Sequence, residues 1–105
     1  MGFVRALAKS ELQPGQGKQL VLDGRKIAIF NVNGQYHAVD DVCTHDEASL
    51  SEGAAYAEGC RCVVECPWHG SRFDLASGAA LTLPAVRPVK AYPVREVDGA
   101  LEVEL

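Results

Sequence analysis

Two pairs of cysteine and histidine residues have the spacing of metal ligands. Cys43 and His45 are in Cys-x-His spacing, and Cys66 and His69 are in Cys-x-x-His spacing, with 20 residues between the pairs. Thiolate sulfur and imidazole nitrogen bind zinc and iron–sulfur clusters. Each pair is in a glycine-containing segment between predicted strands, so the two pairs are expected to meet as two loops around one centre.

The N-terminal segment MGFVRALAKSEL has no long apolar stretch and no small-residue cleavage site. It also has Ala6 where a myristoylation signal has Ser or Thr. Elsewhere, no window approaches the ~18 consecutive apolar residues of a membrane span. We therefore expect a cytoplasmic protein that does not bind a membrane, and its four cysteines are expected to be metal ligands or reduced thiols.

Composition indicates one small globular domain over residues 1–105. Hydrophobic residues make up 48% of the chain, which is enough for a modest core and argues against disorder. The net charge is −4, and the 10 basic residues are scattered along the chain. Without a basic stripe, the chain is not expected to bind nucleic acid.

Turn signals predict a β-rich fold. Asp23-Gly24, Asn33-Gly34 and Asp98-Gly99 each separate short apolar runs, and these dipeptides favour the positive φ angles of tight hairpin turns. Ser10 to Gln13 could cap one short helical turn, which Pro14-Gly15 would end. The sequence therefore predicts a meander of antiparallel strands.

The predicted strands include residues 20–22, 26–32 and 35–39, which are rich in β-branched and aromatic residues. Residues 101–105 alternate between apolar and acidic side chains, a pattern typical of a half-buried strand. The middle of the chain, roughly 41–88, contains all four cysteines and many glycines. We expect this part to be irregular and to carry the site.

Three segments resemble one known family. CTHDEASLSEG (43–53), CPWHGSRFDLASG (66–78) and LPAVRPVKAYPV (83–94) are similar to the Rieske-type [2Fe-2S] ferredoxins, the small electron carriers of ring-hydroxylating oxygenases. The likeness extends from about Leu20 to the end of the chain. It implies an all-β fold, a Rieske-type sandwich of antiparallel β-sheets with a two-loop cluster-binding tip.

The resemblance also implies a cofactor, ligands and partners. One [2Fe-2S] cluster per chain would be bound by Cys43 and Cys66 at one iron and by His45 and His69 at the other. The chain would be a one-electron carrier and not an enzyme. It would pass electrons from a flavin-dependent reductase to a terminal oxygenase of the aromatic-ring dioxygenase type. Two alternatives within the family are the small subunit of a nitrite reductase and a ferredoxin of iron–sulfur assembly.

Two other classes follow from the same residues. A structural zinc site could use the four proposed ligands, or a set of cysteines that includes Cys60 and Cys62. Zinc would not require the HGSRFD and LPAVRP segments, however. An autonomous oxygenase would need two further histidines and a carboxylate for catalytic iron, and only His37 remains.

Several neighbouring residues have expected roles. Gly70 would let backbone amides approach the cluster sulfides. Trp68 and Pro84 would shield the cluster, although Trp68 could equally be an ordinary core aromatic residue. Phe73 is expected to anchor the second loop in the core. His37 is expected to be a surface histidine or a strand histidine whose hydrogen bonds are satisfied.

The segment AAYAEGCRC lengthens the interval between the motifs relative to typical members of the family. We expect Cys62 to be a small buried strand residue and Cys60 to be an uncommitted thiol. High-potential relatives combine an inter-loop disulfide with hydroxyl donors from a serine and a tyrosine. Here Ala48 and Trp68 are at the disulfide positions, and Phe73 is at the tyrosine position, whereas Ser71 is retained. The resemblance therefore implies a soluble, low-potential member.

Overall fold

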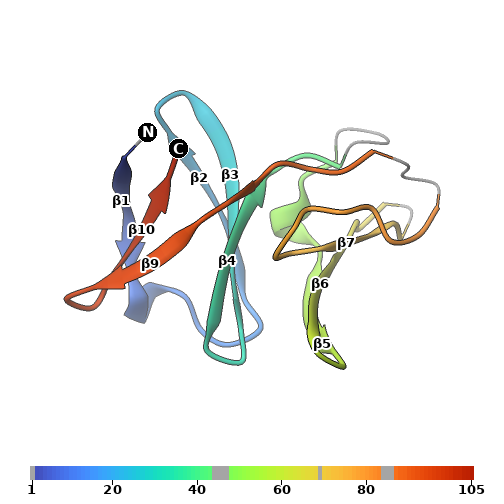
Figure 1. The fold of residues 1–105 in the computed structure, drawn as a ribbon, viewed down its shortest axis with the longest axis horizontal. Coiled ribbons are helices and arrows are strands. Elements are labelled where there is room, and N and C mark those ends of the chain that lie inside the picture. Colours follow the sequence, from blue (N-terminus) through green and yellow to red (C-terminus); the bar gives the residue numbers. More distant parts are fainter. Residues whose placement is uncertain (1, 44–47, 69, 84–86) are drawn as a thin grey trace.

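The computed structural model describes residues 2–43, 48–68, 70–83 and 87–105. In these ranges the chain is all-β, as expected, and its strands form three antiparallel sheets (Figure 1). The strands are β1 (Phe3–Ala8), β2 (Gly17–Leu22), β3 (Arg25–Val32), β4 (Gln35–Asp40), β5 (Ala54–Glu58), β6 (Arg61–Glu65), β7 (Arg72–Asp74), β8 (Ala91–Tyr92), β9 (Val94–Val97) and β10 (Ala100–Glu104).

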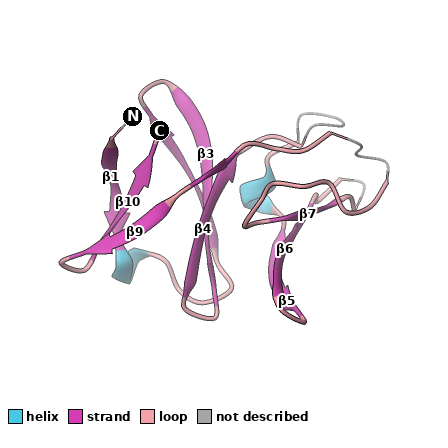
Figure 2. Cartoon of the chain, in the orientation of Figure 1, coloured by secondary structure: helices cyan, strands magenta, loops and turns pink. Residues whose placement is uncertain are grey.

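The three sheets lie side by side along the long axis of the molecule (Figure 1). Sheet A has the strand order β1-β10-β9, sheet B has the order β2-β3-β4-β8, and sheet C has the order β5-β6-β7. Two short 3-10 helices, η1 (Lys9–Glu11) and η2 (Leu50–Glu52), lie in the connections (Figure 2). Sheet B is therefore the middle layer.

Strand β3 is buried on both faces because sheet B lies between two cores. Ile27 and Ile29 belong to one buried cluster, whereas Ala28, Phe30 and Val32 belong to the other. This accounts for the nearly continuous apolar run of β3, since a strand covered on both faces loses the usual alternation. The base core consists of Leu7, Leu12, Ile27, Ile29, Ala38, Tyr92, Leu101 and Val103. The tip core consists of Ala28, Phe30, Val32, Val39, Cys43, Ala48, Leu50, Val64, Cys66, Phe73, Leu75 and Val89.

The three predicted hairpin turns are confirmed. Asp23-Gly24 joins β2 to β3, Asn33-Gly34 joins β3 to β4, and Asp98-Gly99 joins β9 to β10. The first residue of each pair has a φ angle of 53°, 53° and 51°, respectively, and each glycine is also at positive φ. Two successive positive φ angles define the hairpin turn that matches strand twist.

One strand was not predicted, and one expectation was wrong. The N-terminal segment forms β1, which pairs with β10 at the other end of the chain, from Phe3 with Glu104 to Ala8 with Ala100. The middle of the chain is not simply irregular, because it contains the three strands of sheet C. The lengthened segment AAYAEGCRC lies in the β5–β6 hairpin, where Ala57 pairs with Cys62.

The expected short helical turn forms as η1, but Ser10 does not cap it. The side chain of Glu11 instead accepts a hydrogen bond of 2.8 Å from the backbone N–H of Ala8. Among the described residues, no helix is long and apolar enough to cross a membrane.

Candidate metal centre

The first cysteine loop begins after β4. The backbone N–H of Cys43 donates a hydrogen bond of 2.8 Å to the carbonyl of Ala48, so residues 43 and 48 meet at the base of the loop. Both residues are buried, and Cys43 has no exposed surface. His45, the predicted partner of Cys43, lies outside the described residues. The structure therefore describes the base of this loop but not its histidine.

The second cysteine loop begins after β6 and is closed in the same way. The backbone N–H of Cys66 donates a hydrogen bond of 2.7 Å to the carbonyl of Ser71, and the N–H of Gly70 donates one of 3.0 Å to the carbonyl of Cys66. Gly70 has a φ angle of 74°. Glycine adopts this left-handed conformation without steric cost, which explains the residue type at position 70 and was not predicted from the sequence. His69 lies outside the described residues.

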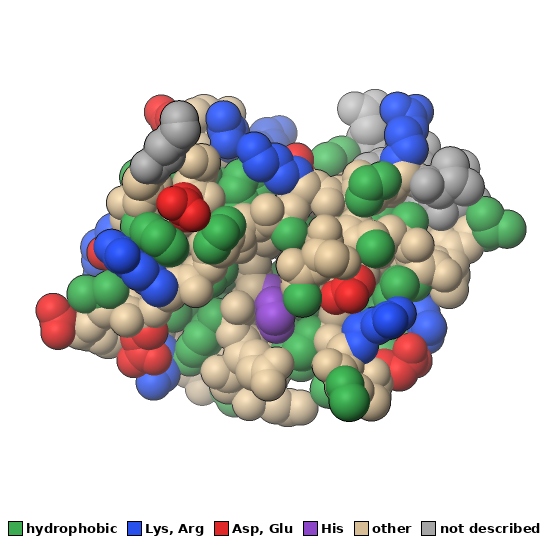
Figure 3. Space-filling model, viewed as in Figure 1, with side chains coloured by type: hydrophobic (Ala, Val, Ile, Leu, Met, Phe, Trp, Pro, Cys, Tyr) green, Lys and Arg blue, Asp and Glu red, His purple; other side chains and the backbone are tan. Residues whose placement is uncertain are grey.

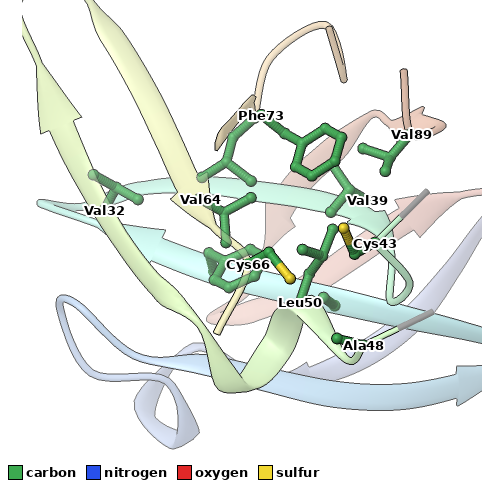
Figure 4. Packing of buried hydrophobic residues seen from close by; sticks show 12 residues of the cluster. Val32, Val39, Cys43, Ala48, Leu50, Val64, Cys66, Phe73 and Val89 are labelled. Carbon is green, nitrogen blue, oxygen red and sulfur yellow. The ribbon is translucent and has the colours of Figure 1, made fainter. Parts of the chain in front are cut away.

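The two loops have the same length and bring both cysteines into one core. Cys43 and Cys66 are 0% and 1% exposed, and both belong to the tip core. Figure 4 shows their sulfur atoms among the side chains of this core, with Leu50 between them in this view. Two buried thiols on two matching loops fit the cysteine half of a cluster bound by two Cys/His pairs.

Phe73 anchors the second loop, as predicted. It is fully buried in the tip core two residues after Ser71. Close backbone contacts hold the neighbouring segments together. A Cβ atom on Gly53 would lie 2.0 Å from the carbonyl oxygen of Glu65, and one on Gly78 would lie 1.9 Å from that of Val89. At both positions, glycine permits an approach that no other residue allows.

Trp68 is not a core residue, and that alternative was wrong. Its exposed fraction is 66%, and Leu83 is exposed to 76%. The predicted shielding role of Pro84 concerns a residue outside the described ranges. Trp68 lies two residues after Cys66, and Leu83 lies in the segment that follows β7. Large apolar side chains with this exposure are available to contact another protein.

His37 is not an exposed histidine, and its hydrogen bonds are not all formed. Among the described residues, no group forms a hydrogen bond with its buried Nε2 atom. Burial lowers the pKa of His37, and the nearby carboxylate of Asp74 partly opposes this effect. Figure 3 shows a histidine side chain in the hollow between the two halves of the molecule. That cleft is lined by Gln35, His37, Cys60, Arg61, Cys62, Asp74 and Ala76.

Cys60 and Cys62 both line this cleft, but they differ in exposure. Cys62 lies in strand β6, as expected, but it is half-buried and not buried, and its thiol donates a hydrogen bond of 3.2 Å to Gln35 Oε1. Burial raises the pKa of Cys62. Cys60 is exposed. In the described ranges, no three Cys, His, Asp or Glu side chains are grouped so that they could hold a metal ion. The zinc set built from Cys60 and Cys62 therefore has no support.

The fold and the paired loops define a class of small β proteins in which two cysteine loops at one end surround a metal centre. The chain belongs to the Rieske [2Fe-2S] domain family, which matches residues 2–93. Members of this family carry one [2Fe-2S] cluster, and the two buried thiols described above fit that group.

Among its relatives, the chain is 43% identical to the biphenyl dioxygenase ferredoxin subunit of Pseudomonas sp. (strain KKS102), over 94% of this chain and 87% of the relative. The solved ferredoxin of carbazole 1,9a-dioxygenase from Nocardioides aromaticivorans IC177 is 33% identical, with a TM-score of 0.89 over 98% of this chain and 97% of that chain. A Mycobacterium tuberculosis structure, provisionally assigned as the small subunit of an NADH-dependent nitrite reductase, is also 33% identical. Its TM-score is 0.86 over 97% of this chain and 93% of that chain.

Proposed function

We propose that this chain is the ferredoxin component of an aromatic-ring dioxygenase system and carries single electrons from a flavin-dependent reductase to a terminal oxygenase. The observation that carries the proposal is the 43% identity to a biphenyl dioxygenase ferredoxin subunit over nearly the whole chain. The chain acts in the cytoplasm as one domain, residues 1–105. It transfers electrons and does not itself convert a substrate.

Four side chains would hold the cluster: Cys43 and Cys66 at one iron, and His45 and His69 at the other. When bound, a [2Fe-2S] cluster accepts and releases one electron. The burial of both cysteines in the tip core supports their part of this assignment. Backbone hydrogen bonds within each loop hold the two cysteines in place, and the surrounding apolar side chains exclude water from the sulfur atoms.

The exposed side chains of Trp68 and Leu83 would form the apolar part of the docking surface. Both redox partners have to approach the cluster closely. When a partner covers exposed apolar side chains beside the loops, the free energy of the complex is lowered. Because the carrier must release each partner, this contact is expected to be small and transient.

Metal analysis tests the ligand assignment. The purified protein is expected to contain two irons and two acid-labile sulfides per chain and to be reddish-brown. His45→Cys or His69→Cys should shift or abolish the visible spectrum, because imidazole and thiolate differ in charge. His37→Ala is the matched control and should leave the spectrum unchanged. A colourless protein with stoichiometric zinc would overturn the assignment.

A second experiment tests the docking surface. Trp68→Ala should raise the concentration of carrier at which oxygenase turnover is half-maximal, with an unchanged visible spectrum. Val21→Ala is a matched control, since Val21 is 64% exposed and lies on β2 of the middle sheet. Equal half-maximal concentrations for the two variants would exclude Trp68 from the interface.

The nitrite reductase alternative is favoured by one observation, the 33% identity and the TM-score of 0.86 to the Mycobacterium tuberculosis structure. A reductase subunit would remain bound to its large subunit, whereas a carrier dissociates between electron transfers. Gel filtration of the protein with each partner separates the two roles. A complex that survives the column would support the subunit role.

A further inference from the structure

A buried acid lies immediately before the first cysteine loop. Asp41 is 5% exposed and is two residues before Cys43. Its position follows β4, at the point where the chain leaves sheet B for the tip. A carboxylate is costly to bury unless hydrogen-bond donors replace the lost water. The contacts of Asp41 therefore indicate what holds it there.

Two residues donate hydrogen bonds to the side chain of Asp41. Ser51 donates its backbone N–H to Oδ1 at 2.7 Å and its hydroxyl to Oδ2 at 2.9 Å. The amide of Gln19, on β2, donates to Oδ2. The backbone N–H of Asp41 donates to the carbonyl of Lys26, on β3, at 3.0 Å. Three hydrogen bonds from these two residues therefore replace the water that burial removes from the two side-chain oxygens.

These contacts join the segments before and after the first cysteine loop. The loop is closed at its base between residues 43 and 48, and the bond from Ser51 to Asp41 closes a second, wider ring around it. Ser51 belongs to η2, and Gly53 at the end of η2 lies against the carbonyl of Glu65, the residue before Cys66. The Asp41 contacts therefore connect the first loop to sheet B and, through η2, to the start of the second loop.

We propose that Asp41 is a positioning residue for the metal centre, with two effects. Its hydrogen bonds hold the segment that carries Cys43 against sheet B and η2. Its fixed negative charge, buried two residues from Cys43, disfavours the addition of an electron to the centre and so lowers the reduction potential. This inference rests on the proposed role of Cys43 as a ligand.

Two substitutions separate the effects in the cluster-loaded protein. Asp41→Asn keeps the shape and one acceptor oxygen for the Ser51 N–H, but it removes the charge and the Oδ2 acceptor of the Ser51 hydroxyl and Gln19. It should therefore raise the reduction potential and speed the loss of iron less than Asp41→Ala does. Asp41→Ala removes every side-chain contact. It should release iron to a chelator about tenfold faster. A hydrogen bond to a charged group contributes more free energy than one between neutral groups, and the loss of one such bond is enough for a change of about tenfold in rate. Asp41→Ala should also speed hydrogen exchange at the Ser51 amide.

The matched control is Glu52→Gln, which removes an exposed acidic charge from the residue next to Ser51. It should change neither the potential nor the rate of iron loss. If Asp41→Ala does not accumulate as a folded protein, Ser51→Ala provides the second variant, since it removes the hydroxyl donor and should speed iron loss to a smaller extent.

The proposal is overturned if Asp41→Asn and wild type have the same potential, or if Asp41→Ala retains iron and protects the Ser51 amide as wild type does. Failure of the proposed function gives a different result, because wild type itself would then contain no iron–sulfur cluster or would not reduce the oxygenase.

Discussion

At the scale of single residues, Ser71 and Phe73 bear on the reduction potential. Both are fully buried next to the second cysteine loop. Because the chain has phenylalanine at the tyrosine position and no cysteines at the disulfide positions, we expect a potential near the lower end of the Rieske range, about −150 mV.

Ser71→Ala should lower this potential by roughly 20 to 60 mV, the equivalent of one hydrogen bond of about 0.5 to 1.5 kcal/mol to the reduced centre. Protein-film voltammetry measures the shift directly. Ser10→Ala is the control, because Ser10 is an exposed serine on η1. A strongly positive potential in wild type, or no shift in Ser71→Ala, would contradict this account.

His37 makes stability depend on pH. Burial lowers its pKa from the ordinary value of 6.5, against the opposing effect of Asp74. The other charged or titratable groups of its cleft are Cys60, Arg61 and Cys62. As pH falls below about 6.5, the unfolded chain binds a proton at His37 more readily than the folded chain does, so the folded state loses stability.

His37→Gln removes this titrating group. The melting temperature of wild type minus that of the variant should therefore decrease as pH falls from about 7.5 to about 5.5. The reddish-brown colour at each pH serves as the control that the cluster is retained. Parallel pH profiles for the two proteins would show that His37 does not contribute.

At the scale of elements, the contact between η2 and β6 depends on Gly53. A Cβ atom there would lie 2.0 Å from the carbonyl oxygen of Glu65. Gly53→Ala should destabilise the fold by about 1 to 3 kcal/mol, because backbone has to move to relieve the overlap. This corresponds to a decrease in Tm of at least about 4 °C. Gly2→Ala is the control, since its Cβ would meet nothing within 4 Å.

The β5–β6 hairpin carries two cysteines that the proposed site does not need. In the double variant Cys60→Ser, Cys62→Ser, iron content and visible spectrum should be unchanged. A serine at position 62 can still donate to Gln35, so the loss of stability should stay below about 1 kcal/mol. Cys43→Ser is the positive control and should lose the cluster. Loss of iron in the double variant would show that the ligand assignment is wrong.

At the scale of the whole molecule, acidic residues outnumber basic ones by 14 to 10. Among the described residues, ion pairs with acids are formed by Lys9, Arg61, Arg72 and Arg95. Figure 3 shows acidic side chains spread over several parts of one face. The excess negative charge is therefore expected to act on partners as a diffuse field.

Turnover of a reconstituted reductase–carrier–oxygenase chain should accordingly fall as salt rises, because screening shortens the range of attraction from about 10 Å at 0.1 M salt to about 3 Å at 1 M. Direct reduction of the carrier by dithionite, measured over the same salt series, separates effects on the partners from effects on the cluster. Turnover that does not depend on salt would remove electrostatic steering from the mechanism.

Local features of this protein could be predicted from its sequence. The turns at Asp23-Gly24, Asn33-Gly34 and Asp98-Gly99 follow from backbone preferences of two adjacent residues, and the structure confirms all three. The burial of Phe73 was also predicted correctly. The two Cys/His pairs were proposed from their spacing, because a ligand motif is a local pattern. Their histidines lie outside the described residues, so the ligand assignment stays a prediction.

The pairing of β1 with β10, the exposure of Trp68 and the contacts of Asp41 were decided only by the tertiary structure. Strand pairing between the two ends of a chain depends on which edges remain open after the rest has folded, and no local pattern encodes this. Trp68 is exposed because no segment among the described residues covers it. Asp41 is buried because Gln19 and Ser51, far from each other in sequence, meet at its carboxylate. Sequence shows what a residue can donate or accept, whereas the fold determines which partner it meets.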